Sequence, residues 1–434
     1  DSGAKAIIIF ENSCHTLAEV LEKTQIEKVL TTQIGDFLAF PKSLLVNFVI
    51  KKVKKMVPAW SIAGSSSFKE ILFKSVEDNF KPVTIDREDT AFLQYTGGTT
   101  GVSKGAELTH SNIVSNMLQA RAWLNNKVRE GEEIIITPLP LYHIFSLTAN
   151  CFIFFSLGGL NVLITNPRDM PGFVKELSKW KFTSFTGVNT LFNGLVNTPG
   201  FDQVDFSALR LTLGGGMAVQ RAVADKWKAV TKCTLIEAYG LTETSPAACI
   251  NPMTLPDYNG NIGLPISSTE VVIKDDDGKN LAVGEVGEIA IKGPQVMKGY
   301  WNRPDETAKV MTDDGYFVTG DIGIMDEQGY FKIVDRKKDM ILVSGFNVFP
   351  NEVEEVLVTH PKVFEAAAIG IPDEKSGEAV KAFVVKKDDS LTADELKAFC
   401  RENLTGYKVP RHFEFREDLP KSNVGKILRK ELRS

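Results

Sequence analysis

Length, composition and charge are those of an ordinary globular protein with several domains. The chain has 434 residues, of which 43% are hydrophobic and 24% charged, and its net charge is −5. This predicts about two to four domains or subdomains, and the near balance of charge gives no overall field that would attract nucleic acid.

The cysteines, histidines and apolar runs predict a cytoplasmic protein with no zinc site and no membrane span. The five cysteines and five histidines are scattered, and no two cysteines form a Cys-x-x-Cys pair, a pattern typical of a reducing compartment. No apolar run reaches the ~20 residues that cross a bilayer. The chain opens on the acidic residue Asp1, so we expect no signal peptide, which needs a basic n-region.

The first residues predict a βαβ unit. Ala6–Phe10 and Lys28–Thr32 favour strands, and Thr16–Lys23 between them has the pattern of a helix. No strand is visible before Ala6, so we expect the chain to start partway into a domain.

Residues Ser43–Val57 predict a basic amphipathic helix. Its broad apolar face includes Leu44, Leu45 and Phe48. Its charge comes from Lys51, Lys52, Lys54 and Lys55. Such a helix can lie on an anionic membrane surface or dock as a surface helix on its own domain. If it contacts a membrane, we expect that contact to be peripheral, on the inner face.

The stretch Gln94–Gly105 is rich in glycine and threonine and contains one lysine, Lys104. Glycine lets the backbone approach a ligand closely, successive N–H groups in such a turn suit an anion, and lysine adds a mobile charge that suits phosphate. The stretch therefore predicts a loop that grips a polyphosphate, although a flexible surface turn has the same composition. It is not a Walker loop, because Lys104 is followed by Gly105 instead of serine or threonine.

Between Ser111 and Ala238, predicted strands and helices alternate. The expected strands are Glu133–Thr137, Leu160–Thr165, Thr183–Gly187, Leu209–Leu213 and Thr234–Ala238. The expected helices are Ser111–Arg129, Ser146–Leu157, Met170–Trp180, Thr190–Asn197 and Val219–Val230. This alternation predicts an α/β fold with a mainly parallel, doubly wound sheet, in which ligands bind at the carboxyl ends of the strands.

The rest of the chain predicts a β-rich subdomain, a hinge and a small domain. Short strands separated by Asp-Gly and similar turns over residues 251–335 favour a small antiparallel β-barrel or meander. The charge run Asp335–Asp339 has the composition of a linker, so we place a hinge at 336–339. Residues 1–335 would then form the large domain, and 340–434 a small mobile α+β domain.

Five further segments contain residues that could take part in chemistry, and each also has an ordinary structural explanation. Gly214–Gly216 would admit a flat ligand or allow tight helix–strand packing. In Tyr239–Glu243 the tyrosine could stack on a base and the glutamate could hold magnesium, or the segment is a plain loop. His143 is either catalytic or a satisfied core residue. Asp321 either binds ribose or serves a turn. Lys426 lies in a basic stretch that also suits a solvated helix face.

In this order and spacing, the segments resemble those of the adenylate-forming acyl-CoA synthetases, and closely those of the bacterial-type long-chain fatty acid–CoA ligases. The resemblance covers essentially the whole chain. The segments that carry it are Tyr95–Gly105, Tyr239–Thr244, Asp314–Asp321, Asp335–Asp339, Ser344–Glu352 and Pro420–Leu432.

The resemblance implies ATP-dependent ligation of a long-chain fatty acid to coenzyme A through an acyl-AMP intermediate, with release of AMP and pyrophosphate and with Mg²⁺ as cofactor. Catalysis then needs positive charge where carboxylate and triphosphate meet. Lys426 would bridge the carboxylate and the α-phosphate, and His143 would gate access to the carboxylate. Glu243 would coordinate magnesium. The ATP- and AMP-binding residues implied are Thr96, Gly97, Gly98, Thr99, Thr100, Gly101, Lys104, Gly214, Gly215, Gly216, Tyr239, Gly240, Thr242, Asp321 and Arg336.

The resemblance further implies that the small domain rotates about Lys338 between the two half-reactions. Rotation would withdraw Lys426 and bring the loop at Ser344 and Gly345 to the coenzyme A side. Candidate lining residues of an apolar acyl pocket are Phe152–Phe155, Phe185, Val188, Leu191 and Phe192. Family members carry a longer large domain, so we expect this chain to lack its N-terminal segment.

Other functions remain open at the level of sequence. The carboxylate could be an aryl or medium-chain acid, or the acyl-AMP could be delivered to a carrier protein. A non-catalytic nucleotide-binding fragment is the alternative from a different class, although Lys426, Glu243 and the phosphate loop argue against it. The oligomeric state, monomer or homodimer, does not follow from the sequence.

Overall fold

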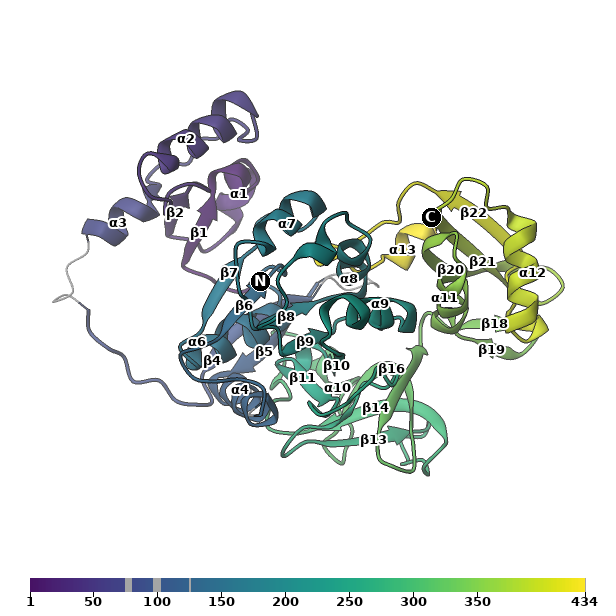
Figure 1. The fold of residues 1–434 in the computed structure, drawn as a ribbon. Helices are drawn as coiled ribbons and strands as arrows, with labels where there is room; N and C mark the ends of the chain where they lie inside the picture. The colour runs from purple at the N-terminus through teal and green to yellow at the C-terminus, as the bar shows by residue number, and fades with distance from the viewer. Residues whose placement is uncertain (75–79, 97–102, 125, 434) are drawn as a thin grey trace. The chain divides into compact units, whose positions relative to one another are not determined.

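The computed structural model describes residues 1–74, 80–96, 103–124 and 126–433. The chain divides into two compact units, Asp1–Asp86 and Arg87–Ser434 (Figure 1). In the described residues no helix combines the length and the apolar character needed to cross a membrane.

The first unit is a small parallel sheet with short helices. The strands β1 (Ala6–Phe10), β2 (Lys28–Thr32) and β3 (Ser66–Ser67) pair in that order. The helices are α1 (Cys14–Val20), α2 (Lys42–Phe48), the π-helical turn η3 (Val49–Val53) and α3 (Phe68–Lys74). The predicted βαβ unit is therefore present, with both strands at their expected bounds.

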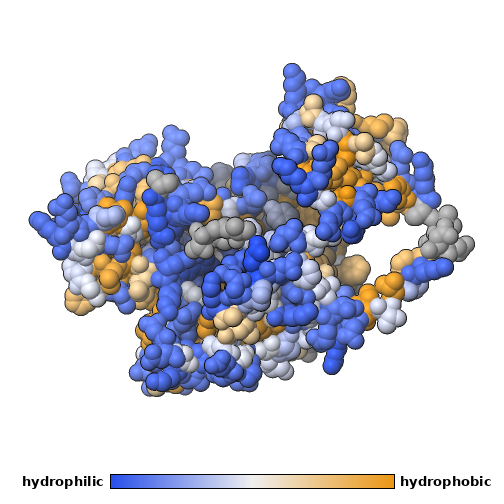
Figure 2. All heavy atoms as spheres, turned by 180° about the vertical axis from the view of Figure 1, so that it is seen from behind, coloured by the Kyte–Doolittle hydropathy of each residue, from blue (hydrophilic) through white to orange (hydrophobic). Residues whose placement is uncertain are grey.

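The first unit has a small core and much exposed apolar surface. Its buried hydrophobic residues are Cys14, Leu17, Val29 and Ile62. In the predicted amphipathic segment, Leu44 and Leu45 are each 64% exposed and Phe48 is 59% exposed. Figure 2 shows apolar side chains gathered on the surface of this unit.

The second unit is built on a seven-stranded sheet in the order β12-β11-β10-β9-β8-β6-β7. Its strands are β6 (Ile134–Thr137), β7 (Leu160–Leu163), β8 (Ser184–Gly187), β9 (Leu211–Gly214), β10 (Leu235–Gly240), β11 (Ala247–Ile250) and β12 (Leu264–Pro265). The five predicted strands are β6 to β10 and run parallel, whereas β11 and β12 add antiparallel strands at one edge. Every residue of β8 and β9 is buried, so helices must cover both faces of the sheet.

The covering helices fall close to their predicted positions. They are α4 (His110–Leu124), α5 (Ile144–Ser146) continuing through the π-helix η5 (Leu147–Phe152) into α6 (Ile153–Ser156), α7 (Met170–Leu177), α8 (Asn189–Val196) and α9 (Arg221–Thr231). The helix α4 packs against η5 and α6, while α8 packs against α7 and α9.

The two ends of the glycine-rich stretch lie on paired antiparallel strands, which together are called the phosphate hairpin below. Strand β4 (Thr90–Thr96) pairs antiparallel with β5 (Lys104–Thr109), so that Tyr95 lies opposite Gly105 and Thr96 opposite Lys104. A third strand, β15 (Gly299–Tyr300), pairs with the other side of β5. The intervening residues 97–102 lie outside the described part of the chain.

The predicted β-rich region is an antiparallel sheet in the order β13-β14-β16-β17. Its strands are β13 (Glu270–Lys274), β14 (Val286–Lys292), β16 (Phe317–Met325) and β17 (Phe331–Arg336), and α10 (Pro304–Ala308) lies between β15 and β16 in the chain.

The C-terminal part has the predicted α+β composition. Strands β18 (Ile341–Val343), β19 (Phe346–Val348), β20 (Val363–Asp373), β21 (Gly377–Lys386) and β22 (His412–Arg416) form one sheet. The helices are α11 (Pro350–Thr359), α12 (Ala393–Asn403) and α13 (Arg429–Leu432). The terminal segment is a loop that ends in the short helix α13.

Candidate active site

Two predicted site segments, Gly214–Gly216 and Tyr239–Gly240, lie side by side where the neighbouring strands β9 and β10 end. These strands are parallel neighbours, with Gly214 opposite Glu237. A Cβ on Gly214 would come within 2.7 Å of Leu235 Cδ2, so close packing accounts for that glycine. Gly216 has a φ of +77°, and a Cβ there would lie 3.2 Å from Lys426 Cε. The third glycine therefore leaves room for the side chain of Lys426.

Lys426 reaches this place on the loop that precedes α13. The loop is held to α8 because Thr190 Oγ1 donates to the carbonyl oxygen of Gly425 at 2.9 Å. Burial and the nearby Arg336 lower the pKa of Lys426 to about 8, while Asp321 and Glu243 act in the opposite direction. Lys426 thus lies within electrostatic range of three other predicted site residues.

His143 is neutral at physiological pH. Burial and the charge of Lys426 lower the pKa of His143 to about 4. Its Nδ1 accepts a hydrogen bond from the backbone N–H of Phe145 at 3.3 Å, at the start of α5. In the neutral ring the proton is therefore on Nε2, which can donate to an anionic oxygen.

Asp321, Arg336 and Tyr239 form one polar cluster. Asp321 on β16 lies opposite Arg336 on β17, and Arg336 Nε is 3.3 Å from Asp321 Oδ1. The Tyr239 hydroxyl donates to Asp321 Oδ2 at 2.8 Å. Burial, followed by the charge of Asp321, raises the pKa of Tyr239 well above its usual value. Asp321 thus already accepts from a buried phenol, and a carboxylate retains further lone pairs for a ribose hydroxyl.

The predicted phosphate-binding residues are described only in part. Thr96 and Lys104 face each other across the hairpin, and Thr96 Oγ1 donates to the carbonyl oxygen of Lys104 at 3.4 Å. Lys104 forms an ion pair with Glu306 of α10. The remaining predicted residues, Gly97, Gly98, Thr99, Thr100 and Gly101, lie outside the described residues.

Glu243 lies on the short 3₁₀ turn η7 (Thr242–Thr244) that follows β10. Its Oε1 accepts a hydrogen bond from the Tyr300 hydroxyl at 2.8 Å. Among the described residues no group of three or more His, Cys, Asp or Glu side chains could hold a metal by themselves. A single carboxylate together with substrate phosphates is, however, an ordinary magnesium site, so Glu243 fits a metal that arrives with ATP.

Tyr300 and Glu306 contact predicted site residues although no sequence motif points to them. The ring of Tyr300 lies 5.1 Å from Lys104 Nζ, while its hydroxyl reaches Glu243. Their segment, Tyr-Trp-Asn-Arg-Pro-Asp-Glu, has the composition of a turn followed by a surface helix. Its pairing with β5 joins residues about two hundred positions apart, which no local pattern reveals.

A partly open cavity of about 90 Å³ adjoins these residues. The predicted site residues that line it are His143, Gly215, Gly216, Tyr239, Gly240, Thr242 and Lys426. Its apolar lining includes Ala120, Leu124, Phe145, Ala149, Ile153, Phe154, Leu211 and Leu213. One space therefore joins the polar site to an apolar compartment between α4 and η5–α6.

The four predicted acyl-pocket residues of the β8–α8 region are not part of this lining. Phe185 and Phe192 pack on Trp227, with ring centroids 5.2 and 4.8 Å away, in the main core. Leu191 belongs to the same core, and Val188 lies beside Gly425 of the Lys426 loop. Only Ile153 and Phe154 of the predicted Phe152–Phe155 stretch line the cavity. The lining residues Ala120 and Leu124 are apolar and spaced i, i+4 on α4. This spacing is visible in the sequence and could have pointed to this wall of the cavity.

The predicted hinge lies beside a buried ion cluster. The guanidinium of Arg429 contacts Glu354, Asp335 and Asp339, and the two aspartates flank Lys338. Burial and Arg336 lower the pKa of Lys338.

Ser344 and Gly345 form the turn between β18 and β19. The backbone N–H of Ser344 donates to the carbonyl oxygen of Ser376, which belongs to the same C-terminal part. Both residues have positive φ, at 51° and 83°.

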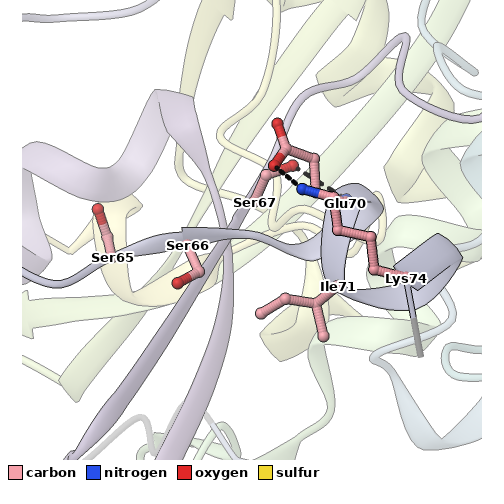
Figure 3. Close-up of a pocket in the computed structure, with 6 residues that line it drawn as sticks. All are labelled: Ser65, Ser66, Ser67, Glu70, Ile71 and Lys74. Atoms are coloured by element: carbon pink, nitrogen blue, oxygen red, sulfur yellow. Dashed lines mark hydrogen bonds and ion pairs between the residues drawn. The ribbon is translucent and has the colours of Figure 1, made fainter. Parts of the chain in front are cut away.

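A second hollow lies in the first unit. It is lined by Ser65, Ser66, Ser67, Glu70, Ile71 and Lys74 (Figure 3). Lys74 Nζ bonds Glu70 Oε2 at 3.2 Å, and the Ser67 hydroxyl accepts from the backbone N–H of Glu70. These contacts stabilise α3 and account for three of the polar side chains, those of Ser67, Glu70 and Lys74.

Comparisons with known proteins give matches along most of the chain. The family model of the AMP-binding enzymes matches residues 1–301, and that of the AMP-binding enzyme C-terminal domain matches residues 352–426. A long-chain-fatty-acid–CoA ligase of Yersinia pestis is 57% identical over 433 residues, which are 100% of this chain and 77% of that protein. The corresponding ligase of Salmonella typhimurium is 55% identical with the same coverage.

A solved structure gives the same fold. The ATP-bound MatB of Rhodopseudomonas palustris superposes with a TM-score of 0.85 at 28% identity, covering 100% of this chain and 79% of that one.

Proposed function

The chain belongs to the AMP-binding enzyme family, and from that premise we propose that it ligates a long-chain fatty acid to coenzyme A through acyl-AMP, using ATP and releasing AMP and pyrophosphate. One observation carries the proposal. Lys426, His143 and Gly216 line a single cavity whose other lining residues are mostly apolar, as the reaction of a carboxylate with an apolar tail requires. Relatives at 57% and 55% identity bear the name of this activity.

In the adenylation step, Lys426 supplies positive charge between two anions. The fatty acid carboxylate and the α-phosphate repel each other, and a cation in contact with both lowers that repulsion and stabilises the charge of the transition state. Charged residues within electrostatic range of Lys426 include Arg336, Asp321 and Glu243. Bound ATP and carboxylate would stabilise the ammonium further.

His143 positions the carboxylate without adding charge. Its neutral ring carries the proton on Nε2, which can donate to a carboxylate oxygen while Nδ1 stays bonded to Phe145. Its place in the cavity lining suits a gate between the polar site and the apolar compartment.

The nucleotide would be held by three groups of residues. Asp321 and Arg336 would bind the ribose, and Gly214–Gly216 with Tyr239 and Gly240 would enclose the adenine. Thr242 would contact the α-phosphate, and the hairpin of Thr96, Gly97–Gly101 and Lys104 would hold the β- and γ-phosphates. Glu243 would hold Mg²⁺, which when bound neutralises phosphate charge and stabilises the departing pyrophosphate.

The acyl chain would enter the apolar compartment between α4 and η5–α6. Each buried methylene contributes about 0.8 kcal/mol, so the residues that close this compartment would set the preferred chain length. We place the acyl pocket here and not at Phe185, Val188, Leu191 and Phe192.

The second half-reaction would use a rotation of residues 340–434 about Lys338, within a hinge at 336–339. The large domain would comprise 1–335, with 251–335 as its β-rich subdomain. Rotation would remove Lys426 from the cavity and bring the turn at Ser344 and Gly345 to the thioester-forming site. The positive φ of both turn residues supports a tight, exposed turn of this kind.

Peripheral membrane contact through residues 43–57 belongs to the same proposal. Exposed Leu44, Leu45 and Phe48 adjoin the lysines of the segment, and Lys51 also pairs with Glu11 at 2.9 Å. Such contact would place a cytoplasmic enzyme, monomer or homodimer, on the inner face of a membrane. Flotation with anionic liposomes tests it: binding should be lost on replacing Lys51, Lys52, Lys54 and Lys55 by glutamine, and no binding at low salt would exclude it.

The decisive experiment compares the protein with Lys426→Ala in both half-reactions. We expect the variant to lose adenylation and to keep much of its thioester formation from supplied acyl-AMP. Equal loss of both steps would contradict the proposed division of labour. If the unmodified chain forms no thioester, the alternative of a non-catalytic nucleotide-binding protein remains.

A panel of acids and acceptors distinguishes the remaining alternatives. Pyrophosphate release should be fastest with a long-chain fatty acid, and coenzyme A should be the acceptor. Faster pyrophosphate release with an aryl or medium-chain acid would show that the substrate is that acid and not a long-chain fatty acid. Transfer of the acyl group only to a carrier protein would show that the acceptor is not coenzyme A.

A further inference from the structure

The segment from Met297 to Lys309 connects the phosphate hairpin to the Glu243 turn. The backbone N–H of Met297 donates to the carbonyl oxygen of Glu243 at 2.8 Å. Four residues later, the N–H of Trp301 donates to the carbonyl oxygen of Gly105, also at 2.8 Å. One stretch of backbone therefore fixes the spacing between the two places predicted to hold the phosphates and their metal.

The helix α10 in this segment carries a carboxylate that holds two lysines. Glu306 Oε2 pairs with Lys104, and its Oε1 pairs with Lys309. These two hydrogen bonds lower the pKa of Glu306 to about 2, so it is an anion throughout the physiological range. The side chain of Lys104 is 32% exposed and that of Lys309 is 65% exposed, so the second partner lies nearer to solvent.

The ammonium of Lys104 is the predicted ligand of the β- and γ-phosphates, and a carboxylate competes for the same hydrogen bonds. Phosphate and carboxylate both accept charge-assisted hydrogen bonds from an ammonium. A lysine on a flexible stem can move from one anion to the other. The ring of Tyr300, 5.1 Å from Lys104 Nζ, gives the ammonium a surface near which to move.

We propose that Glu306 is an internal substitute for the phosphate of the nucleotide. In the nucleotide-free protein it holds Lys104, and when a nucleoside triphosphate binds, Lys104 is transferred from Glu306 to the polyphosphate. Lys309 remains on Glu306 as its counter-ion, so the exchange leaves no unpaired carboxylate. The proposal rests on the proposed function, because that function assigns the polyphosphate to this hairpin.

Two opposite changes in ATP affinity follow from this arrangement. Without the carboxylate, Lys104 no longer has a competing partner, so Glu306→Gln should lower the dissociation constant of ATP. Without Lys309, Glu306 has only Lys104 to pair with and holds it more tightly, so Lys309→Met should raise the dissociation constant of ATP. An ion pair of this exposure corresponds to a change of about two- to fivefold in each direction. The double variant should resemble Glu306→Gln, because Lys309 acts only through Glu306.

The experiment is isothermal titration of the full chain with Mg-ATP, without fatty acid, so that no turnover occurs. Asp305→Asn and Lys298→Met are matched controls. Asp305→Asn removes one negative charge, as Glu306→Gln does, and Lys298→Met removes one positive charge, as Lys309→Met does. All four residues lie on the segment Met297–Lys309, but Lys298 pairs with Glu107 and not with Glu306. Both controls should change ATP affinity less than the corresponding test variant. Lys104→Met should abolish the effect of Glu306→Gln.

Weaker ATP binding in Glu306→Gln would overturn the proposal, because it would mean that Glu306 positions Lys104 for phosphate instead of competing for it. A decrease in affinity in Lys309→Met no larger than that in Lys298→Met would also overturn it. The measured quantity, the affinity for Mg-ATP, does not depend on the acyl substrate. A protein that binds ATP with these shifts but forms no acyl-CoA would refute the proposed function and leave the exchange standing.

Discussion

Lys426 combines two properties that a solvent-exposed lysine lacks. Its ammonium is partly desolvated, which strengthens its interaction with an arriving anion, and it lies near Asp321 and Glu243, which favour its charged form. The result is a pKa of about 8, close to the pH at which the enzyme would work. The protonation state of one residue can therefore control the first half-reaction.

Adenylation should decline as the pH rises through about 8. Lys426 is a cation below its pKa of about 8 and neutral above it, so the bridging charge is present on the acid side and lost on the alkaline side. The value belongs to the free protein and should appear in kcat/KM, whereas bound anions raise it in kcat. Pyrophosphate release measured between about pH 6.5 and 9.5 checks this. In any active Lys426→Arg variant the alkaline decline should disappear, because arginine stays charged; a flat profile in the unmodified protein would contradict the assignment.

Gly216→Ala should impair adenylation with little effect on folding. The new Cβ would lie 3.2 Å from Lys426 Cε at a backbone φ of +77°, so Lys426 would be displaced. We expect a loss of about tenfold or more in acyl-AMP formation, since a displacement of about 1 Å can cost a hundredfold. Gly278→Ala is the matched control, because Gly278 has a φ of +80° and open space around its Cβ position. Equal effects of the two substitutions on adenylation would show that only backbone strain matters.

At the scale of elements, the central sheet could be predicted and the hairpin could not. Strands β6 to β10 are short runs of apolar and β-branched residues between turn signals, so their local pattern is sufficient. Strand β5 begins at Lys104 and includes Gly105 and Glu107, which have low strand propensity. It is stabilised by pairing with β4 and with the distant β15. Long-range pairing of this kind leaves no local trace.

The same limit explains which site residues were predicted. Residues within recognisable motifs, such as His143, Asp321 and Lys426, do converge on one cavity or its electrostatic surroundings. Large aromatic residues such as Phe185 and Phe192 suit either an acyl tunnel or a core, so the sequence does not distinguish the two. Only three-dimensional packing on Trp227 shows that they form the core.

The ion cluster of Arg429 should stabilise the C-terminal part in a pH-dependent manner. Arg429 is mostly buried and holds Glu354, Asp335 and Asp339. Its replacement by methionine removes the cation that pairs with the buried carboxylates of Asp335 and Glu354, which costs roughly 3 kcal/mol of free energy of unfolding. Burial already raises the pKa of Asp335 to about 6, and loss of the nearby cation raises it further. A raised carboxyl pKa costs stability above that pKa, where the buried group must ionise. The loss should therefore be larger at about pH 8 than at about pH 5.

Urea denaturation of Arg429→Met at both pH values measures this. Arg433→Met is the control, because Arg433 is more exposed and contacts only Asp339 of these carboxylates. A loss that is independent of pH would show that packing, and not the unpaired charge of Asp335, accounts for the effect.

At the scale of the second unit, one face of α8 attaches the C-terminal part to the rest. Thr190 donates to the carbonyl oxygen of Gly425, and Asn193 Nδ2 donates to the carbonyl oxygen of Phe364 at 3.0 Å. Lys387 Nζ donates to Asn197 Oδ1, also at 3.0 Å. Thr190 and Asn193 lie on one face of α8, and Asn197 is the residue that caps its C-terminal end. These are polar contacts in a limited set, as expected of an interface that must separate.

A cross-link across this interface should separate the two half-reactions. In Asn197→Cys/Lys387→Cys, a short bis-maleimide would join α8 to the end of β21 in the arrangement that places Lys426 in the cavity. The linked protein should form and retain acyl-AMP, because adenylation uses this arrangement, and should lose at least tenfold in thioester formation, because the rotation about Lys338 is prevented. Each single cysteine variant treated with the same reagent should keep both steps, which controls for modification of the native Cys151, the native cysteine that is partly exposed. If the linked protein forms the thioester at the unmodified rate, both half-reactions proceed in one arrangement and no rotation of the C-terminal part is required.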